Sequence, residues 1–239
     1  MHASHSGAKP EGGDHRLASP PVPDWNAPSQ SSAESINYVR MRRWLWILLA
    51  LGLIGWLASP PMHHARAREP GVLVPAQPDQ HNLDHATAFQ DKDFSITPLA
   101  DYAITARVLS RADYSYDAVS SISPTDLALG WGRMSDSAVL GKLDISQSGR
   151  WYYYHWGSDG PPIPLAEIIR SSSNMHMLPA DDTVRAMLRR VNPGDIVHLE
   201  GQLIEAHGPN NSLWRSSMTN DRTGDGACKV VYVRSLVVM

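Results

Sequence analysis

The spacing of hydrophobic residues changes along the chain and predicts different structures in different segments. An apolar run without charge extends from Trp44 to Ala58, directly behind the basic segment 40–43. Over residues 102–108, apolar and polar side chains alternate, which predicts a strand with one buried face. Behind Asp182, apolar residues recur three and four positions apart, which predicts an amphipathic helix.

Capping residues, prolines and glycines mark the other predicted elements. A short helix is expected from Ser123, with Pro124 in its first turn, to Gly130 or Gly132. Two more short helices are expected, at about 136–140 and at 165–170. Further strands are expected at 143–146, 150–156, 196–206, 213–217 and 228–238. This order predicts an α+β fold: a small, strongly bent antiparallel sheet or partly open barrel with a few short helices, preceded by one transmembrane helix.

Composition divides the chain into four parts. We expect a disordered cytoplasmic tail at 1–39, a membrane anchor or signal segment at 40–60, a Pro-rich extended stalk at 61–93 and a globular extracytoplasmic domain at 94–239. The arginines in front of the apolar run keep the N-terminus in the cytoplasm by the positive-inside rule. The predicted localisation is therefore a single-pass protein of the inner membrane, with its C-terminal domain in the periplasm.

The apolar run is short for a membrane span. As a helix, its about 15 residues reach roughly 22 Å, less than the roughly 30 Å of the hydrocarbon core. One alternative is a cleaved signal peptide that starts at Met41, with Ala65-Arg66-Ala67 as the cleavage motif. A buried core helix is the other alternative. In each case the function is expected to reside in the C-terminal domain.

Charge and cysteine content exclude some classes of function. The chain holds 21 Lys and Arg against 24 Asp and Glu, and no basic stripe appears in its C-terminal domain. A nucleic-acid partner is therefore not expected. Cys228 is the single cysteine, so an intrachain disulfide is excluded.

Aromatic residues provide the best candidates for binding. Trp131 lies between two glycines, where its ring is either a cover for the core or a surface on which a ligand stacks. The aromatic segment 151–156 offers a matching surface, although alternate side chains of a strand also pack inward. We expect the binding surface to include Trp131, Asp136, Asn174 and His176.

Two weaker candidates concern catalysis and metal binding. Cys228 could act as a nucleophile with His176 as its base, but the sequence assigns no residue to orient the histidine, and a lone cysteine in a strand usually packs in the core. Asp221, Thr223 and Asp225 match positions 1, 3 and 5 of a calcium loop. Position 12 of that loop is a tyrosine instead of the chelating glutamate, so an ordinary turn is the alternative. No cofactor is expected.

Four strings of residues carry a resemblance. They are 123–136 (SPTDLALGWGRMSD), 173–176 (SNMH), 194–201 (GDIVHLEG) and 224–228 (GDGAC). Together they resemble a group of uncharacterised bacterial membrane-anchored proteins. That resemblance implies a single domain with a membrane tether and no particular activity.

The sequence thus predicts a non-catalytic binding or accessory module of the bacterial cell envelope. Its partners are expected to be membrane lipid, through residues 44–58, and an envelope protein. The alternatives are a thiol-dependent enzyme that uses Cys228 with His176, and a structural subunit of an envelope assembly.

Overall fold

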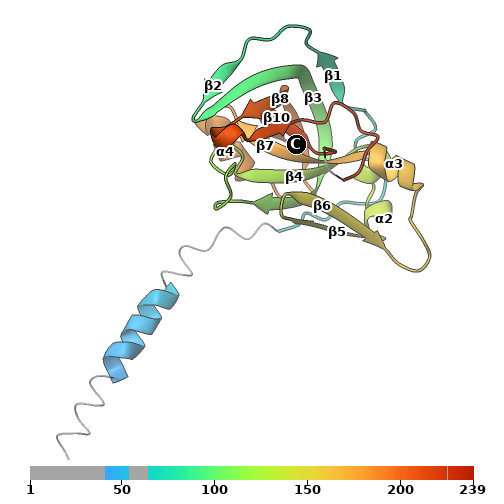
Figure 1. The fold of residues 1–239 in the computed structure, drawn as a ribbon. Coiled ribbons are helices and arrows are strands. Elements are labelled where there is room, and N and C mark those ends of the chain that lie inside the picture. Colours follow the sequence, from blue (N-terminus) through green and yellow to red (C-terminus); the bar gives the residue numbers. More distant parts are fainter. Residues whose placement is uncertain (1–40, 54–63, 225) are drawn as a thin grey trace, which may run out of the picture. The chain divides into compact units, whose positions relative to one another are not determined.

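The computed structural model describes residues 41–53, 64–224 and 226–239, which belong to two compact units, 1–61 and 62–239. In the first unit, residues 41–53 form a helix, blue in Figure 1. No helix within the described ranges is both long and apolar enough to cross a membrane. The end of the predicted apolar span, 54–58, and the predicted tail, 1–39, lie outside the described residues.

The second unit is mostly sheet with a few short helices. Its strands are β1 (Asp79–Asn82), β2 (Phe89–Asp91), β3 (Phe94–Asp113), β4 (Thr125–Gly130), β5 (Leu143–Ser148), β6 (Trp151–Trp156), β7 (Ser172–Pro179), β8 (Ile196–His207), β9 (Leu213–Arg215) and β10 (Lys229–Val238). Its α-helices are α2 (Ser137–Leu140), α3 (Leu165–Arg170) and α4 (Asp182–Leu188). Short 3-10 turns lie at Gly132–Ser135 and Pro209–Asn211. The predicted α+β class is confirmed at this level.

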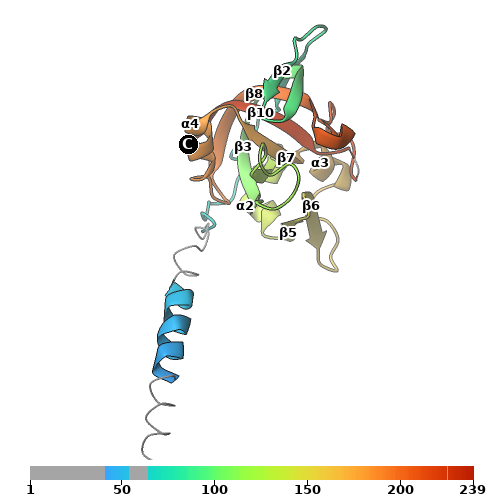
Figure 2. The same cartoon turned by 60° about the vertical axis from the view of Figure 1, so that its left-hand side comes forward.

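The main sheet is strongly curled around its core. Its strands follow the order β1-β3-β4-β7-β10-β8-β9, β2 pairs with β3, and β8 also pairs with β3. The 20-residue strand β3 makes the curl possible, because residues 95–107 pair with β8 while 107–113 pair with β4. β7 and β10 run parallel, and the other pairs are antiparallel. Figures 1 and 2 show β3 sweeping across the domain.

Alternation along the central strands separates the core from the opposite face. Leu127 of β4, Met175 of β7 and Val231 of β10 are fully buried members of the main hydrophobic cluster. Since successive side chains of a strand point to opposite faces, the residues next to these three in each strand point away from that cluster. Asp126 and Asn174 are two of these residues, and both belong to the candidate site.

Several predicted elements are confirmed. Asp136 and Asp181 each accept a hydrogen bond from the backbone N–H two or three residues later, so they cap α2 and α4 as their position before each helix suggests. Helix α3 has the expected bounds, and β5, β6, β8, β9 and β10 lie in the expected segments.

The helix expected from Ser123 is wrong. Residues from Thr125 onward form β4, and all six of its residues are buried. The local pattern Ser-Pro-Thr-Asp suits a helix start, but here it leads into a strand that pairs on both sides, with β3 and with β7. Tertiary pairing overrides the local signal. Strand β7 was not predicted, because its polar residues are buried as well and leave no alternation of exposure to recognise.

Residues 66–77 form an N-terminal strap that lies against the domain, instead of the extended stalk expected at 61–93. The N–H of Arg66 donates to the Pro193 carbonyl at 2.7 Å, and its guanidinium lies 2.8 Å from the buried carboxylate of Asp195. Further along, Val74 is buried and its carbonyl accepts from the N–H of Gly132 at 2.7 Å. The compact unit thus begins well before the boundary expected at residue 94.

Gly194 shows how closely the strap is fitted. Its φ of +87° lies in the left-handed region, and an added Cβ would lie 2.1 Å from the Arg66 carbonyl oxygen. A glycine is required at this position on both counts.

Candidate functional site

A two-residue turn in the hairpin β5–β6 positions the central residue of the site. Gly149 and Arg150 both have positive φ, 56° and 71°, as a type I′ turn requires. Glycine or asparagine is usual at such positions, so the left-handed conformation of Arg150 costs on the order of 1 kcal/mol. Its N–H donates to the hydroxyl of Tyr114 at 3.0 Å, which helps to hold this backbone in place.

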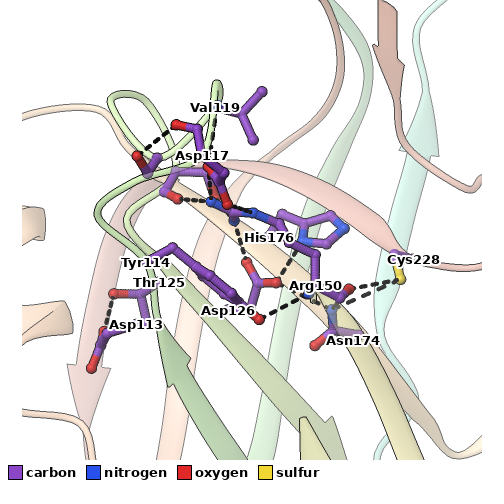
Figure 3. A network of polar contacts seen from close by, with 12 residues as sticks. Asp113, Tyr114, Asp117, Val119, Thr125, Asp126, Arg150, Asn174, His176 and Cys228 are labelled. Carbon is purple, nitrogen blue, oxygen red and sulfur yellow. Dashed lines mark hydrogen bonds and ion pairs between the residues drawn. The ribbon is translucent and has the colours of Figure 1, made fainter. Parts of the chain in front are cut away.

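Arg150 joins this turn to the loop after β3 and to β4 (Figure 3). Its guanidinium pairs with Asp117 at 2.8 Å and with the fully buried Asp126 at 2.9 Å. It also stacks over the rings of Tyr114 and Trp214, at 4.1 and 5.4 Å from the ring centroids. The hydrogen bond from Arg150 holds the pKa of Asp117 below its usual value. These contacts make Arg150 the centre of a largely desolvated polar network.

Two residues of β7 extend the network. His176 Nδ1 lies 2.9 Å from the second carboxylate oxygen of Asp126, and its ring packs on Trp214 with centroids 4.6 Å apart. The amide of Asn174 donates to the Arg150 carbonyl at 3.0 Å and accepts from Gln147 at 2.6 Å. Both side chains are about 3% exposed, so their orientations are fixed by the protein itself.

Two cavities adjoin this network. The larger has a volume of about 420 Å³ and is lined by 151–155 of β6, 172–174 of β7 and the loop between β9 and β10. The smaller has a volume of about 300 Å³ and is lined by Arg150, His176, Trp214 and neighbouring residues. The two cavities share Trp151, Gly224 and Cys228 in their walls, so they meet at these residues. Volumes of this size are typical of small-molecule sites.

Cys228 lies where the cavities meet, but its surroundings do not activate it. Its Sγ is 3.8 Å from the Asn174 amide nitrogen and 4.0 Å from the Arg150 carbonyl oxygen. Burial raises the pKa of the thiol, and the nearby Asp126 carboxylate raises it further. A reactive cysteine requires the opposite shift.

The structure brings together some of the predicted site residues and separates others. Asn174 and His176 lie in the cavity walls, whereas Trp131 and Asp136 line neither cavity. The proposed stacking surface at Trp131 needs correction, because its side chain is fully buried in the core and its indole N–H donates to Gln77 of the strap at 2.8 Å. Asp136 accepts backbone hydrogen bonds from Gly71 and Ala138, which lower its pKa.

The weak calcium candidates show no ligand arrangement among the residues that can be described. The Asp221 carboxylate accepts from the hydroxyl of Thr219 and lies 3.9 Å from Arg222, whereas Asp225 lies outside the described residues. Within the described ranges, no group of three or more His, Cys, Asp or Glu side chains is placed to hold a metal ion.

Sequence reasoning missed three central residues: Asp126, Arg150 and Trp214. Asp126 was assigned to the wrong element, a helix start. Arg150 follows Ser148-Gly149 between two strand-like segments, which is a turn signal that could have placed it at a hairpin tip. No local pattern indicates that an exposed-looking arginine in a turn reaches a buried carboxylate on another strand.

We compared the chain with known protein families, curated proteins and solved structures. No model of a protein family matches this chain, and no match was found among the curated proteins or the solved structures.

Proposed function

We propose that residues 62–239 form a non-catalytic ligand-binding module, tethered to the inner membrane by the apolar segment that begins at Trp44. The observation that carries this proposal is the pair of cavities that meet at Trp151 and Cys228 beside the Arg150 network. The side chains of this network form part of the cavity walls, and they are held in place by hydrogen bonds and ion pairs. A site of this kind loses little conformational entropy when a ligand binds.

The curl of the sheet supports the same role. Five strands, β3, β4, β7, β8 and β10 in chain order, pair in a circuit, which supports describing them as a small, partly open barrel. Five-stranded barrels of the OB type bind oligonucleotides or oligosaccharides on the face of their second and third strands and on the loops beside it. In this chain those strands are β4 and β7, which carry Asp126, Asn174 and His176.

One observation favours a thiol-dependent enzyme as the second candidate. The Asp126 carboxylate lies 2.9 Å from His176 Nδ1, although without the geometry of a hydrogen bond, and His176 and Cys228 both line the smaller cavity. The raised pKa of Cys228 disfavours this function, because the thiolate is the nucleophile. Binding therefore stands first.

A ligand screen with matched variants tests the binding proposal. The full chain in detergent is heated with a library of small molecules, saccharides and oligonucleotides, and its unfolding temperature is recorded. A ligand at 100 times its Kd adds about 2.7 kcal/mol to the free energy of unfolding. Trp151→Ala, which alters the wall shared by both cavities, should abolish the shift, whereas Tyr116→Ala should not, because Tyr116 is fully exposed and lines neither cavity.

The outcome also separates binding from catalysis. Hits that depend on Trp151 support the module. Hits that bind equally well to Trp151→Ala would place the site elsewhere. Turnover of a hit that is lost in Cys228→Ser and in His176→Gln would instead establish the enzyme.

A further inference from the structure

We infer that the ligand of the two cavities is a neutral saccharide. This inference rests on the binding function proposed above and adds the chemical class of the ligand. It follows from three properties of the walls: their arginines lie near carboxylates of the protein, one wall is aromatic, and a wall residue carries a buried acceptor without a hydrogen-bond partner.

Each arginine in the cavity walls lies close to a carboxylate of the protein. Arg150 is paired with Asp117 and Asp126, as described above. Arg215 pairs with Glu205, whose pKa is lowered chiefly by that contact. Arg222, the arginine in the wall of the larger cavity, lies 3.9 Å from Asp221.

Carboxylates are missing from the described part of the walls. A phosphate or carboxylate ligand would have to compete with Asp or Glu for each arginine, and a cationic ligand would find no counter-charge among the wall residues that the structure describes. A neutral ligand incurs neither cost.

The wall formed by β6 suits the apolar face of a ring. Trp151 and Tyr153 are 37% and 42% exposed, and they lie two positions apart on one strand, so both point to the same side. Their spacing along the strand is roughly 7 Å. The C–H face of a pyranose packs on such a ring, and two rings along a strand accommodate consecutive sugar units of a short chain.

Apart from Arg222, the remaining side chains that provide polar groups to the larger cavity are uncharged. They include Ser172, Ser173 and Asn174 of β7 and Asn220 and Thr223 of the loop between β9 and β10. The side-chain oxygen of Asn220 is buried and has no hydrogen-bond partner in the described part of the chain. An orphaned buried acceptor costs about 1–3 kcal/mol, so a rotation of the Asn220 side chain that brings this oxygen to a ligand donor would be favourable. A sugar hydroxyl provides that donor.

These features favour a saccharide over single-stranded nucleic acid, which also stacks on aromatic side chains. Proteins that bind single strands combine the aromatic platform with a positively charged groove along the phosphates. Here the arginines of the site are paired and the chain as a whole carries a formal charge of −3.

Calorimetric titration with defined probes tests the inference. The full chain in detergent is titrated with cellotetraose, maltotetraose and chitotetraose, and separately with an eight-residue oligothymidylate. We expect one or more of the tetrasaccharides to bind and the oligothymidylate not to bind. Trp151→Ala and Asn220→Leu should each weaken saccharide binding by about tenfold or more, since each removes one of the contacts named above. Tyr116→Ala serves as the matched aromatic control, and its affinity should equal that of the wild type.

The possible failures are distinguishable. Binding of the oligothymidylate, or of a charged hit from the library screen, that is lost in Trp151→Ala would overturn the saccharide inference and leave the binding function intact. Saccharide binding that is unchanged in both Trp151→Ala and Asn220→Leu would overturn the placement of the site. Circular dichroism of each variant shows whether the fold is retained, and if Trp151→Ala does not fold, Tyr153→Ala replaces it.

Discussion

Arg150 is predicted to be the residue on which the candidate site depends most for its stability. Its side chain is 13% exposed and faces the fully buried carboxylate of Asp126. In Arg150→Met the chain keeps a side chain of similar length but leaves that carboxylate with its remaining partners, His176 and the Asn174 amide. Removal of one partner from a buried ion pair typically costs about 3–5 kcal/mol, because the other charge stays desolvated. This is a large part of the 5–15 kcal/mol that stabilises a typical domain.

Urea denaturation, followed by circular dichroism, measures the loss. Arg133→Met provides a matched control, because Arg133 also pairs with a carboxylate, Glu167, but does so at the surface, where the loss should be much smaller. In the double variant Arg150→Met/Asp126→Asn, the buried charge is removed together with its partner, so the combined loss should be less than the sum of the single losses. A loss below about 1 kcal/mol in Arg150→Met, or additivity in the double variant, would refute the role assigned to this pair.

Three further predictions concern the strap, the core and the thiol. Gly194→Ala should lower the free energy of unfolding by about 1–3 kcal/mol and speed proteolysis within residues 66–77, because its Cβ would meet the Arg66 carbonyl; unchanged proteolysis would show that the strap is not held there. Burial lowers the pKa of Lys229 from 10.5 to about 8, so between about pH 8 and 10.5 the unfolded state binds more protons than the folded one. The stability of the wild type should therefore rise relative to Lys229→Met over that interval, and a difference that does not change with pH would contradict the burial of this ammonium. Cys228 should react with a thiol reagent more slowly at pH 8 than it does in urea, since its pKa is raised by burial; equal rates would contradict its position.

The elements that the sequence predicted correctly are those whose signals are local. Helix α4 combines a capping aspartate with apolar residues at helical spacing. Helix α3 begins directly after Pro164, which marks its start in the sequence. Strands β6 and β8 are rich in residues that favour extended structure. In each case neighbouring residues decide the structure, so a single sequence suffices.

The errors concern segments that are defined by distant contacts. The pattern from Ser123 to Asp126 suits a helix in isolation but is paired on both sides as β4. The strap is rich in proline and shows no periodic spacing of apolar residues, so its sequence suggests an extended stalk. In the structure Arg66 pairs with the carboxylate of Asp195, which is distant in the sequence. Such contacts leave no trace in local spacing.

The candidate site was predicted in part for the same reason. Asn174 and His176 stood out as polar residues close together in the sequence, and both lie in the cavity walls. Trp131 also stood out, but its glycine neighbours allow close packing around a buried ring as readily as exposure on a loop. The position of Arg150 depends on a turn, a loop and two strands together, and no single segment encodes it.

The rate at which Cys228 is alkylated reports whether the cavities are occupied, because this single thiol lies where the two cavities meet. The full chain in detergent is treated with iodoacetamide, alone and with each tetrasaccharide at a saturating concentration. If a neutral saccharide occupies the cavities, one or more of the tetrasaccharides should slow the alkylation, and the oligothymidylate should leave the rate unchanged. An alkylation rate that none of the saccharides alters would show that these saccharides do not occupy the cavities.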